Sequence, residues 1–458
     1  MLGGTGVHGY QPNKIQFRKG RLQTSRPARI LQEPGFQRLL TSAEVETAVS
    51  RFDSTELAFA PRQGWFVIDR HNGVPLCAVA DRQAENACSK AGFKATARVN
   101  RQVLIDTISS TYADSIADKA SNALSQMCPG LSANRVVTPA QTVFGCMLLA
   151  TGGVVAWYFP DAFRLMLVVM FSTLFVAVGC LKLASVFVHG KAIPPDLACL
   201  QARLSFYNSN ENWLTRQFTM EYASVFDLML PMLARFGLPL PLGGTSNHFR
   251  LDALRQAGGW DAWNVTEDTD LGLRLSRMGY RSEVLVSSTF EEANCEVRNW
   301  LFQRARWLKG WMQTWLVHMR NPVRTWRELG TASFLVSQLL MAGMIGSALL
   351  HPVFAVILVH DLAWSKHSPD PLYQYCALAV LVFGYAAVML AAARALYMRR
   401  LYPLFPSILT MPVYWMLISI GGWLALWQLI RALFHWNKTN HGISNVFEQN
   451  SERETDRK

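Results

Sequence analysis

The chain has 458 residues, and its 44 Lys and Arg against 32 Asp and Glu give it a net charge of +12. Half of the residues are hydrophobic, yet only 17% are charged, against about 25% in soluble domains. This deficit indicates a membrane protein whose apolar residues form blocks, and it excludes fibrous and wholly disordered chains. The eight Cys residues form no CxxC pair, so a zinc ribbon and a thioredoxin motif are excluded, and we predict no metal-binding residues.

The N-terminal region is predicted to lie outside the membrane. Residues 1–34 are basic and carry no acid before Glu33. We interpret them as a disordered cytoplasmic arm that contacts anionic lipid, with an organelle transit peptide as the alternative. Residues 35–134 predict a small soluble α/β region, with strand-like runs at 64–69 and 74–79 and helix-like runs at 43–52, 82–91 and 101–127.

Apolar blocks begin after residue 135. Residues 136–188 carry two long apolar runs separated by Pro160 and Asp161, which predicts a helical hairpin across the bilayer. A polar segment at 191–328 follows, and then three more apolar blocks, at 331–360, 371–393 and 404–431. Prolines near the start of the last block shorten its helical part, so it either spans the membrane or lies in the interface. The side on which the tail at 432–458 lies is therefore left open.

The loop charges predict the orientation. Basic residues flank the 191–328 segment and fill the loop at 394–400, whereas the loop at 361–370 holds two Asp against one Lys. The positive-inside rule then places the N-terminus, the 191–328 segment and the 394–400 loop in the cytoplasm. The predicted fold class is a multi-pass protein of the inner (plasma) membrane, mainly α-helical spans, with a small cytoplasmic α/β region and the N-terminal soluble α/β region. We predict that the protein contacts the lipid bilayer and does not bind nucleic acid.

The most distinctive feature of the polar segment is the triplet Thr266-Glu267-Asp268, which leads directly into a helix together with Asp270. Acids in a first helical turn are also favoured by the macrodipole, and Thr266 can cap, so an ordinary helix start is the simpler interpretation. The like charges raise the pKa of Asp268 and the helix N-terminus lowers it, so the sequence leaves the direction of a net shift open.

Two further features lie in the same segment. Gln303, Arg306 and Trp307 lie in a run where Trp and basic residues alternate at helical spacing. This predicts an amphipathic interfacial helix with Trp toward the headgroups and bases toward water, and a plain interfacial anchor would share that pattern. The other feature is a loop that contains Gly244, Thr245, Asn247 and His248. Glycine lets the backbone of such a loop approach a ligand closely, and an ordinary turn is the alternative interpretation.

In this order the motifs resemble those of family 2 glycosyltransferases, the membrane synthases of cellulose, hyaluronan and other β-glycans, from about Pro194 through the last apolar block. The resemblance implies an inverting transfer of a sugar from a nucleotide-sugar donor to a growing polysaccharide, with Asp268 as catalytic base. A base is needed to take the proton of the acceptor hydroxyl. The substrate-binding residues implied are Thr266, Glu267, Gln303, Arg306, Trp307, Gly244, Thr245, Asn247 and His248.

The chain departs from the family pattern on the donor side. In the family, parallel βαβ units and a DxD motif that holds Mg²⁺ or Mn²⁺ precede the triplet. No DxD motif lies between Val188 and Thr266, and too few residues remain there for several units of about 30 residues each. We therefore expect an incomplete GT-A-like domain with two to four strands, in a chain that does not bind the donor by itself. The alternative is a non-catalytic membrane relative that binds glycan or a partner synthase.

Overall fold

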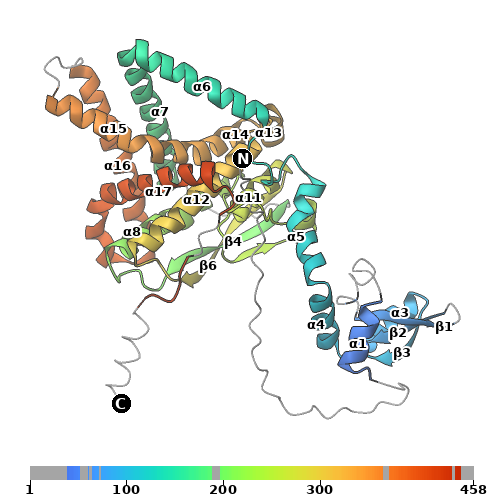
Figure 1. Cartoon of the computed structure of the whole chain (residues 1–458). Coiled ribbons are helices and arrows are strands. Elements are labelled where there is room, and N and C mark those ends of the chain that lie inside the picture. Colours follow the sequence, from blue (N-terminus) through green and yellow to red (C-terminus); the bar gives the residue numbers. More distant parts are fainter. Residues whose placement is uncertain are drawn as a thin grey trace, which may run out of the picture. The chain divides into compact units, whose positions relative to one another are not determined.

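The computed structural model describes residues 39–51, 60, 64–71, 74–187, 196–364, 371–435 and 439–444. The chain divides into two units, Met1–Ile116 and Ala117–Lys458 (Figure 1). The basic arm predicted at 1–34, the residues 188–195 after the predicted hairpin, and the tail beyond residue 444 lie outside the described residues.

The first unit is a small α/β fold, as its sequence predicts. Strand β2 pairs antiparallel with β1 and parallel with β3. Each helix begins at a side-chain cap, which satisfies N–H groups of the first turn. The elements are α1 (Ser42–Val49), β1 (Trp65–His71), β2 (Val74–Val79), α3 (Arg82–Lys90), β3 (Lys94–Arg98) and α4 (Arg101–Thr111). The single helix predicted at 101–127 is interrupted at Tyr112, whose hydroxyl donates to the carbonyl of Val49 (2.8 Å).

The second unit contains a three-stranded sheet in the order β5-β4-β6. The central strand β4 (Leu197–Phe206) pairs in parallel with β6 (Arg281–Glu291) and antiparallel with β5 (Asn247–Phe249). The described part of the 191–328 segment thus contains three strands, within the predicted range. Its other elements are α8 (Trp213–Ser224), η1 (Val225–Met229), α9 (Leu230–Arg235), α10 (Leu251–Gln256), α11 (Glu267–Arg277), α12 (Val297–His318) and α13 (Pro322–Leu329).

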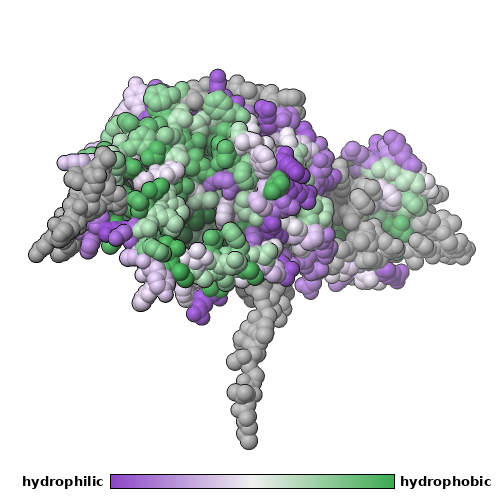
Figure 2. All heavy atoms as spheres, turned by 90° about the horizontal axis from the view of Figure 1, so that it is seen from above, coloured by the Kyte–Doolittle hydropathy of each residue, from purple (hydrophilic) through white to green (hydrophobic). Residues whose placement is uncertain are grey.

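Five helical segments of the described chain are long and apolar enough to cross a membrane. On the face shown in Figure 2, hydrophobic residues gather into a broad patch, and many large apolar side chains of these helices are exposed. The segments are α6 (Pro139–Tyr158), α7 (Pro160–Phe187), α14 (Thr331–Gln338) continued by η2 (Leu339–Gly343) and α15 (Met344–Trp364), α16 (Pro371–Arg399), and η3 (Tyr402–Thr410) with α17 (Met411–Arg431). The predicted class, membrane helices joined to a small α/β layer, is therefore confirmed.

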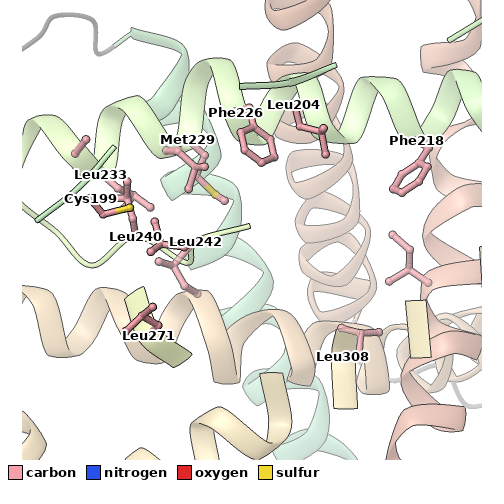
Figure 3. Packing of buried hydrophobic residues seen from close by; sticks show 14 of the residues in the cluster. Cys199, Leu204, Phe218, Phe226, Met229, Leu233, Leu240, Leu242, Leu271 and Leu308 are labelled. Carbon is pink, nitrogen blue, oxygen red and sulfur yellow. The ribbon is translucent and has the colours of Figure 1, made fainter. Parts of the chain in front are cut away.

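One hydrophobic core joins the sheet to the apolar helices. Leu204 of β4, Leu271 of α11 and Leu308 of α12 are buried in one cluster with Phe218 of α8 (Figure 3). The cluster continues to Tyr414 of α17. Burying each such side chain contributes about 1.5–3 kcal/mol, so the layer and the bundle stabilise each other.

The predicted end of the N-terminal region, residue 134, differs from the observed division near Ile116. The guanidinium of Arg320 donates to the carbonyls of Pro129 (3.1 Å), Gly130 (3.0 Å) and Ser132 (2.9 Å). The buried carboxylate of Asp261 accepts from the Ser132 hydroxyl (3.0 Å). These bonds tie the residues that precede α6 to the second unit.

The faces predicted for α12 are wrong. The sequence predicts Trp residues toward the headgroups and basic residues toward water, but the side chains of Trp300 and Lys309 are both fully buried. The Lys309 ammonium donates to the carbonyls of Ala432 (3.3 Å) and His435 (2.6 Å), at the end of α17. The helix is covered by α17 along its length and also contacts α11. A position of α12 near the membrane interface stays a prediction.

Both ends of the last apolar segment meet the polar α/β layer. At its start, Gln217 of α8 donates to the carbonyl of Ser407 (2.7 Å). Just after its end, Gln313 of α12 donates to the carbonyl of Leu433 (2.9 Å). Further along, Glu292 accepts from the backbone N–H groups of residues 443 and 444, at 2.9 and 2.8 Å. A tail across a bilayer could not reach these partners, so residues 432–435 and 439–444 lie on the same side as the 196–329 layer.

This arrangement predicts the accessibility of engineered cysteines. In a chain whose eight native Cys are replaced, His441→Cys and Arg298→Cys should react with a membrane-impermeant maleimide from the same side of oriented vesicles. Ala162→Cys, at the start of α7, should react only from the other side. Labelling of positions 441 and 298 from opposite sides would contradict the placement of the tail.

Candidate active site

The glycine loop between α9 and β5 is folded by a glutamine of the central strand. The buried Gln201 side chain accepts from the Gly243 N–H (2.8 Å) and donates to the carbonyl of Thr245 (2.6 Å). A Cβ atom added to Gly244 would lie 3.1 Å from Oδ2 of Asp268. Glycine therefore lets the loop backbone lie directly against the carboxylate of the triplet.

Three polar side chains of the loop hold its shape. The Thr245 hydroxyl donates to Glu291, and the Asn247 amide donates to the carbonyl of Gly243. Ser246, at φ 52°, shares a hydrogen bond of 2.6 Å with Thr289 of β6. Of the predicted loop residues, Gly244 and His248 are the exposed ones. Thr245 and Asn247 are thus engaged within the protein.

The start of α11 is fastened to α12. Thr266 precedes the helix but makes no side-chain cap, contrary to the simple capping interpretation. Its side chain instead occupies the space that a Cβ atom at Gly310 would need, since such an atom would lie 2.3 Å from the Thr266 hydroxyl oxygen. Asn264 donates to the hydroxyl of Thr314 (2.8 Å) and accepts from the Thr266 N–H (3.0 Å). The two motifs are therefore joined through backbone and small side chains.

Asp268 is half-buried at the start of α11. Its Oδ1 atom accepts a hydrogen bond from the indole N–H of Trp260 (2.7 Å), while Oδ2 lies against Gly244. Burial, reinforced by the charge of Glu267 and partly offset by the Trp260 bond, raises the pKa of Asp268 to about 6. The sequence left the direction of the pKa shift open, and burial decides it. A carboxylate with this pKa can accept a proton near neutral pH.

Asp270, two residues later, is in the opposite situation. It is fully buried, pairs with Arg274 (2.7 Å) and lies 3.0 Å from Nε2 of His318. Burial opposes its charge, but Arg274 and His318 outweigh burial and lower the pKa of Asp270. Arg277 extends the network, since it lies 2.8 Å from Nδ1 of His318 and pairs with Glu328. Asp270 therefore holds α11 against α12 and α13.

The predicted α12 residues lie in different surroundings. Gln303 is buried and accepts from the Asn294 amide (2.8 Å). Burial lowers the pKa of Arg306, while the charge of Glu267 acts in the opposite direction, so Arg306 and Glu267 are electrostatic neighbours. The Trp307 ring centroid lies 6.0 Å from those of Phe218 and Tyr222.

The structure brings some predicted residues together and leaves others apart. Gly244 meets Asp268, Thr266 packs on α12, and an aromatic series connects the loop to Trp307. The series runs from Gly243, where an added Cβ would meet Phe226 at 3.3 Å, through Phe226 and Tyr222 to Trp307. Sequence reasoning did not identify Gln201, Trp260 or Asn294. A glutamine within the apolar run of β4 is a signal for the first, and the other two carry none.

The described residues contain no group of three or more His, Cys, Asp or Glu that could hold a metal ion. Asp268 and Asp270 are two residues apart, but Asp270 is occupied by Arg274 and His318. A divalent metal therefore does not fit these residues.

Replacing Asp270 should lower the stability of the folded α/β layer. Removing one partner of a buried ion pair costs about 3–5 kcal/mol because the other charge is left uncompensated. We expect Asp270→Asn to lower the thermal unfolding midpoint of the purified protein strongly. The exposed Asp252→Asn is the matched control and should change it little. Equal midpoints for the two variants would show that the Asp270 network does not stabilise the fold.

Asp268→Asn should have the opposite effect on stability. The pKa of Asp268 rises from 3.8 to about 6 on folding, so the folded state binds more protons between these values and stability falls as pH rises through this window. The charged carboxylate is thus a cost at neutral pH. We expect Asp268→Asn to raise the free energy of unfolding by about 1–2 kcal/mol at pH 7.5 and to lose this advantage below about pH 4. Unfolding midpoints measured at both pH values provide the test, and a destabilised variant at pH 7.5 would contradict the expectation.

Comparison with known proteins shows which family the chain resembles. A family profile described as glycosyl transferase family group 2 matches residues 173–430, more than half of the chain. Probable glucomannan 4-beta-mannosyltransferase 9 of Oryza sativa subsp. japonica is 30% identical over 120 residues, which are 25% of this chain and 22% of that protein. Glucomannan 4-beta-mannosyltransferase 9 of Arabidopsis thaliana is 32% identical over 117 residues, with the same shares.

A relative that acts on a lipid is also similar. Beta-monoglucosyldiacylglycerol synthase of Synechocystis sp. is 29% identical over 152 residues, 32% of each protein. The chain thus spans 22% to 32% of the length of these curated relatives. Together with the fold of a small α/β layer on membrane helices, the family match leads to one conclusion: the chain belongs to glycosyl transferase family group 2.

Proposed function

We propose that the protein is a membrane-bound glycosyltransferase that transfers a sugar from a nucleotide-sugar donor to a growing polysaccharide with inversion, and that the described residues form the acceptor side of its site. The observation that carries this proposal is the environment of Asp268. Its carboxylate lies against the Gly244 backbone and has a pKa of about 6. As the acceptor oxygen attacks the anomeric carbon and the diphosphate leaves, such a base takes the hydroxyl proton.

Arg306 is the cation that we assign to the leaving diphosphate. It needs to stay charged although it is partly buried, and the neighbouring charge of Glu267 supports this. Guanidinium groups bind phosphate oxygens by charge-assisted hydrogen bonds. In this assignment Glu267 orients Arg306 and does not itself take the proton.

Trp307 is the aromatic platform that we assign to the acceptor sugar. The apolar face of a sugar packs on an aromatic ring, and Trp307 is half-buried beside Phe218 and Tyr222. Gln303, bonded to Asn294, supports the first turns of α12 instead of contacting a sugar. Thr245 and Asn247 likewise shape the loop, while His248 is exposed beside it.

The donor side requires residues beyond those described. The family's divalent metal has no fitting site among the described residues. We infer that a partner synthase supplies the donor-binding half of the site. Isothermal titration of the purified chain with UDP-sugars and Mn²⁺ should then show no micromolar binding, and such binding would contradict this inference.

We also propose that the α/β layer faces the cytoplasm at the inner membrane. Arg399, at the end of α16, pairs with Asp227 of the layer and donates to the Leu204 carbonyl (3.0 Å). Arg164 and Asp361 pair at the other end of the bundle. An excess of basic residues at the layer side supports this orientation by the positive-inside rule.

Base catalysis is tested by Asp268→Asn in membranes that contain the full chain and its partner synthase. Transfer of labelled sugar should fall by about 10²–10⁴, the usual loss for a general base, with donor affinity nearly unchanged. Glu267→Gln is the matched control and should cost less. Unchanged transfer by Asp268→Asn would refute the assignment. Oligosaccharide binding without any transfer by the wild type would favour the alternative of a non-catalytic glycan-binding relative.

A further inference from the structure

The most strongly buried charge beside Trp307 is Arg304. Its guanidinium makes two parallel bonds to Glu221 of α8, at 2.8 and 2.7 Å. The hydroxyl of Tyr414, from α17, donates to Glu221 (2.6 Å) and accepts from Arg304 (3.0 Å). Burial opposes the charge of Arg304, but Glu221 and the tyrosine oxygens outweigh it and hold the pKa of Arg304 above its usual range. This group is therefore a permanent buried cation.

The same guanidinium is surrounded by rings. It lies over Phe218 (5.3 Å), Trp300 (5.1 Å) and Trp307 (5.1 Å), measured from its central carbon to the ring centroids. Arg304 and Trp307 are three residues apart on α12, so their side chains lie on one side of the helix. The contact with the cation thus restricts the orientation of the Trp307 ring from one side, while Phe218 and Tyr222 restrict it from others.

Stability alone does not account for this cluster. A buried ion pair is often no more stabilising than well-packed apolar residues of similar volume. The three hydrogen-bonding residues come from α8, α12 and α17, and Gly421 lets α17 approach closely, since a Cβ there would lie 3.1 Å from the Arg304 side chain. What the directional bonds add is a fixed position of the guanidinium, and with it a fixed orientation of the adjacent indole.

We propose that Glu221, Arg304 and Tyr414 are positioning residues that fix the Trp307 ring for the acceptor sugar. The inference rests on the proposed function for the identity of the ligand, whereas the orientation of the ring is a property of the protein itself. Glu221 and Tyr414 act through Arg304 and do not touch the sugar. The helix α17, which follows the other apolar segments, thereby supports the acceptor site without contacting the sugar.

The test uses Glu221→Gln, which keeps shape but removes charge, and Tyr414→Phe, which removes one hydroxyl. The control is Tyr280→Phe, which removes a hydroxyl that donates to Gln256 instead. The protein is labelled with 5-fluorotryptophan, and the ¹⁹F signal of Trp307 is identified by its loss in Trp307→Phe. Binding of a soluble β-linked oligosaccharide is measured by titration on the same samples.

We expect the Trp307 signal to shift and the oligosaccharide Kd to rise about tenfold in Glu221→Gln and Tyr414→Phe, with unchanged values in the control. An unmoved Trp307 signal in folded Tyr414→Phe would overturn the proposal, as would a shifted signal with unchanged oligosaccharide affinity. If the wild type binds no oligosaccharide while the signal still shifts, the proposed glycan ligand is wrong and the positioning of the ring by the cluster stands.

Discussion

The burial of α12 is the constraint on which the rest of the second unit depends. This helix carries Arg304 and Lys309 into the core, and each charge requires a fixed partner because an unpaired buried charge is costly. Arg304 pairs with Glu221 of α8, and the Lys309 ammonium donates to the carbonyls of Ala432 and His435, just after α17. The polar layer and the last apolar helix are therefore held in place by the same helix.

The position of the candidate base follows from this constraint. Thr266 meets α12 at Gly310 and Asn264 meets it at Thr314, so α12 fixes the place where α11 begins. Farther along, Asp270 and His318 connect the two helices again. A change in the apolar helices that displaced α12 would consequently displace the triplet and Trp307 together.

Much of the architecture could be predicted from the sequence. Long apolar blocks indicate helices that can cross a membrane, and the polar insert between them indicates a separate α/β layer. The limited sheet was predicted from chain length alone, and three strands are observed. The surroundings of α12 could not be predicted. Periodicity shows which side chains share a side of a helix, but not which distant segments cover them, and Arg304 and Tyr414 are 110 residues apart. For the same reason the sequence left open the side of the membrane on which the tail lies. Tertiary hydrogen bonds, such as that from Gln313 to the carbonyl of Leu433, hold the start of the tail against the layer.

Asp268 and Asp270 show why the roles of the acids could not be assigned from spacing. Both lie in the first turn of α11, where the helix dipole favours a negative charge equally. Yet the pKa of Asp268 is raised and that of Asp270 is lowered. At Asp268, burial and the charge of Glu267 raise the pKa and outweigh the hydrogen bond from Trp260. At Asp270, the charge of Arg274 on the same helix and the hydrogen bond to His318 of α12 outweigh burial. A carboxylate that is paired with a permanent cation and bonded to a buried imidazole cannot readily accept a proton, whereas one that is half-buried with a single neutral donor can. Burial and side-chain partners, and not the shared position in the first turn, thus separate the candidate base from its structural neighbour.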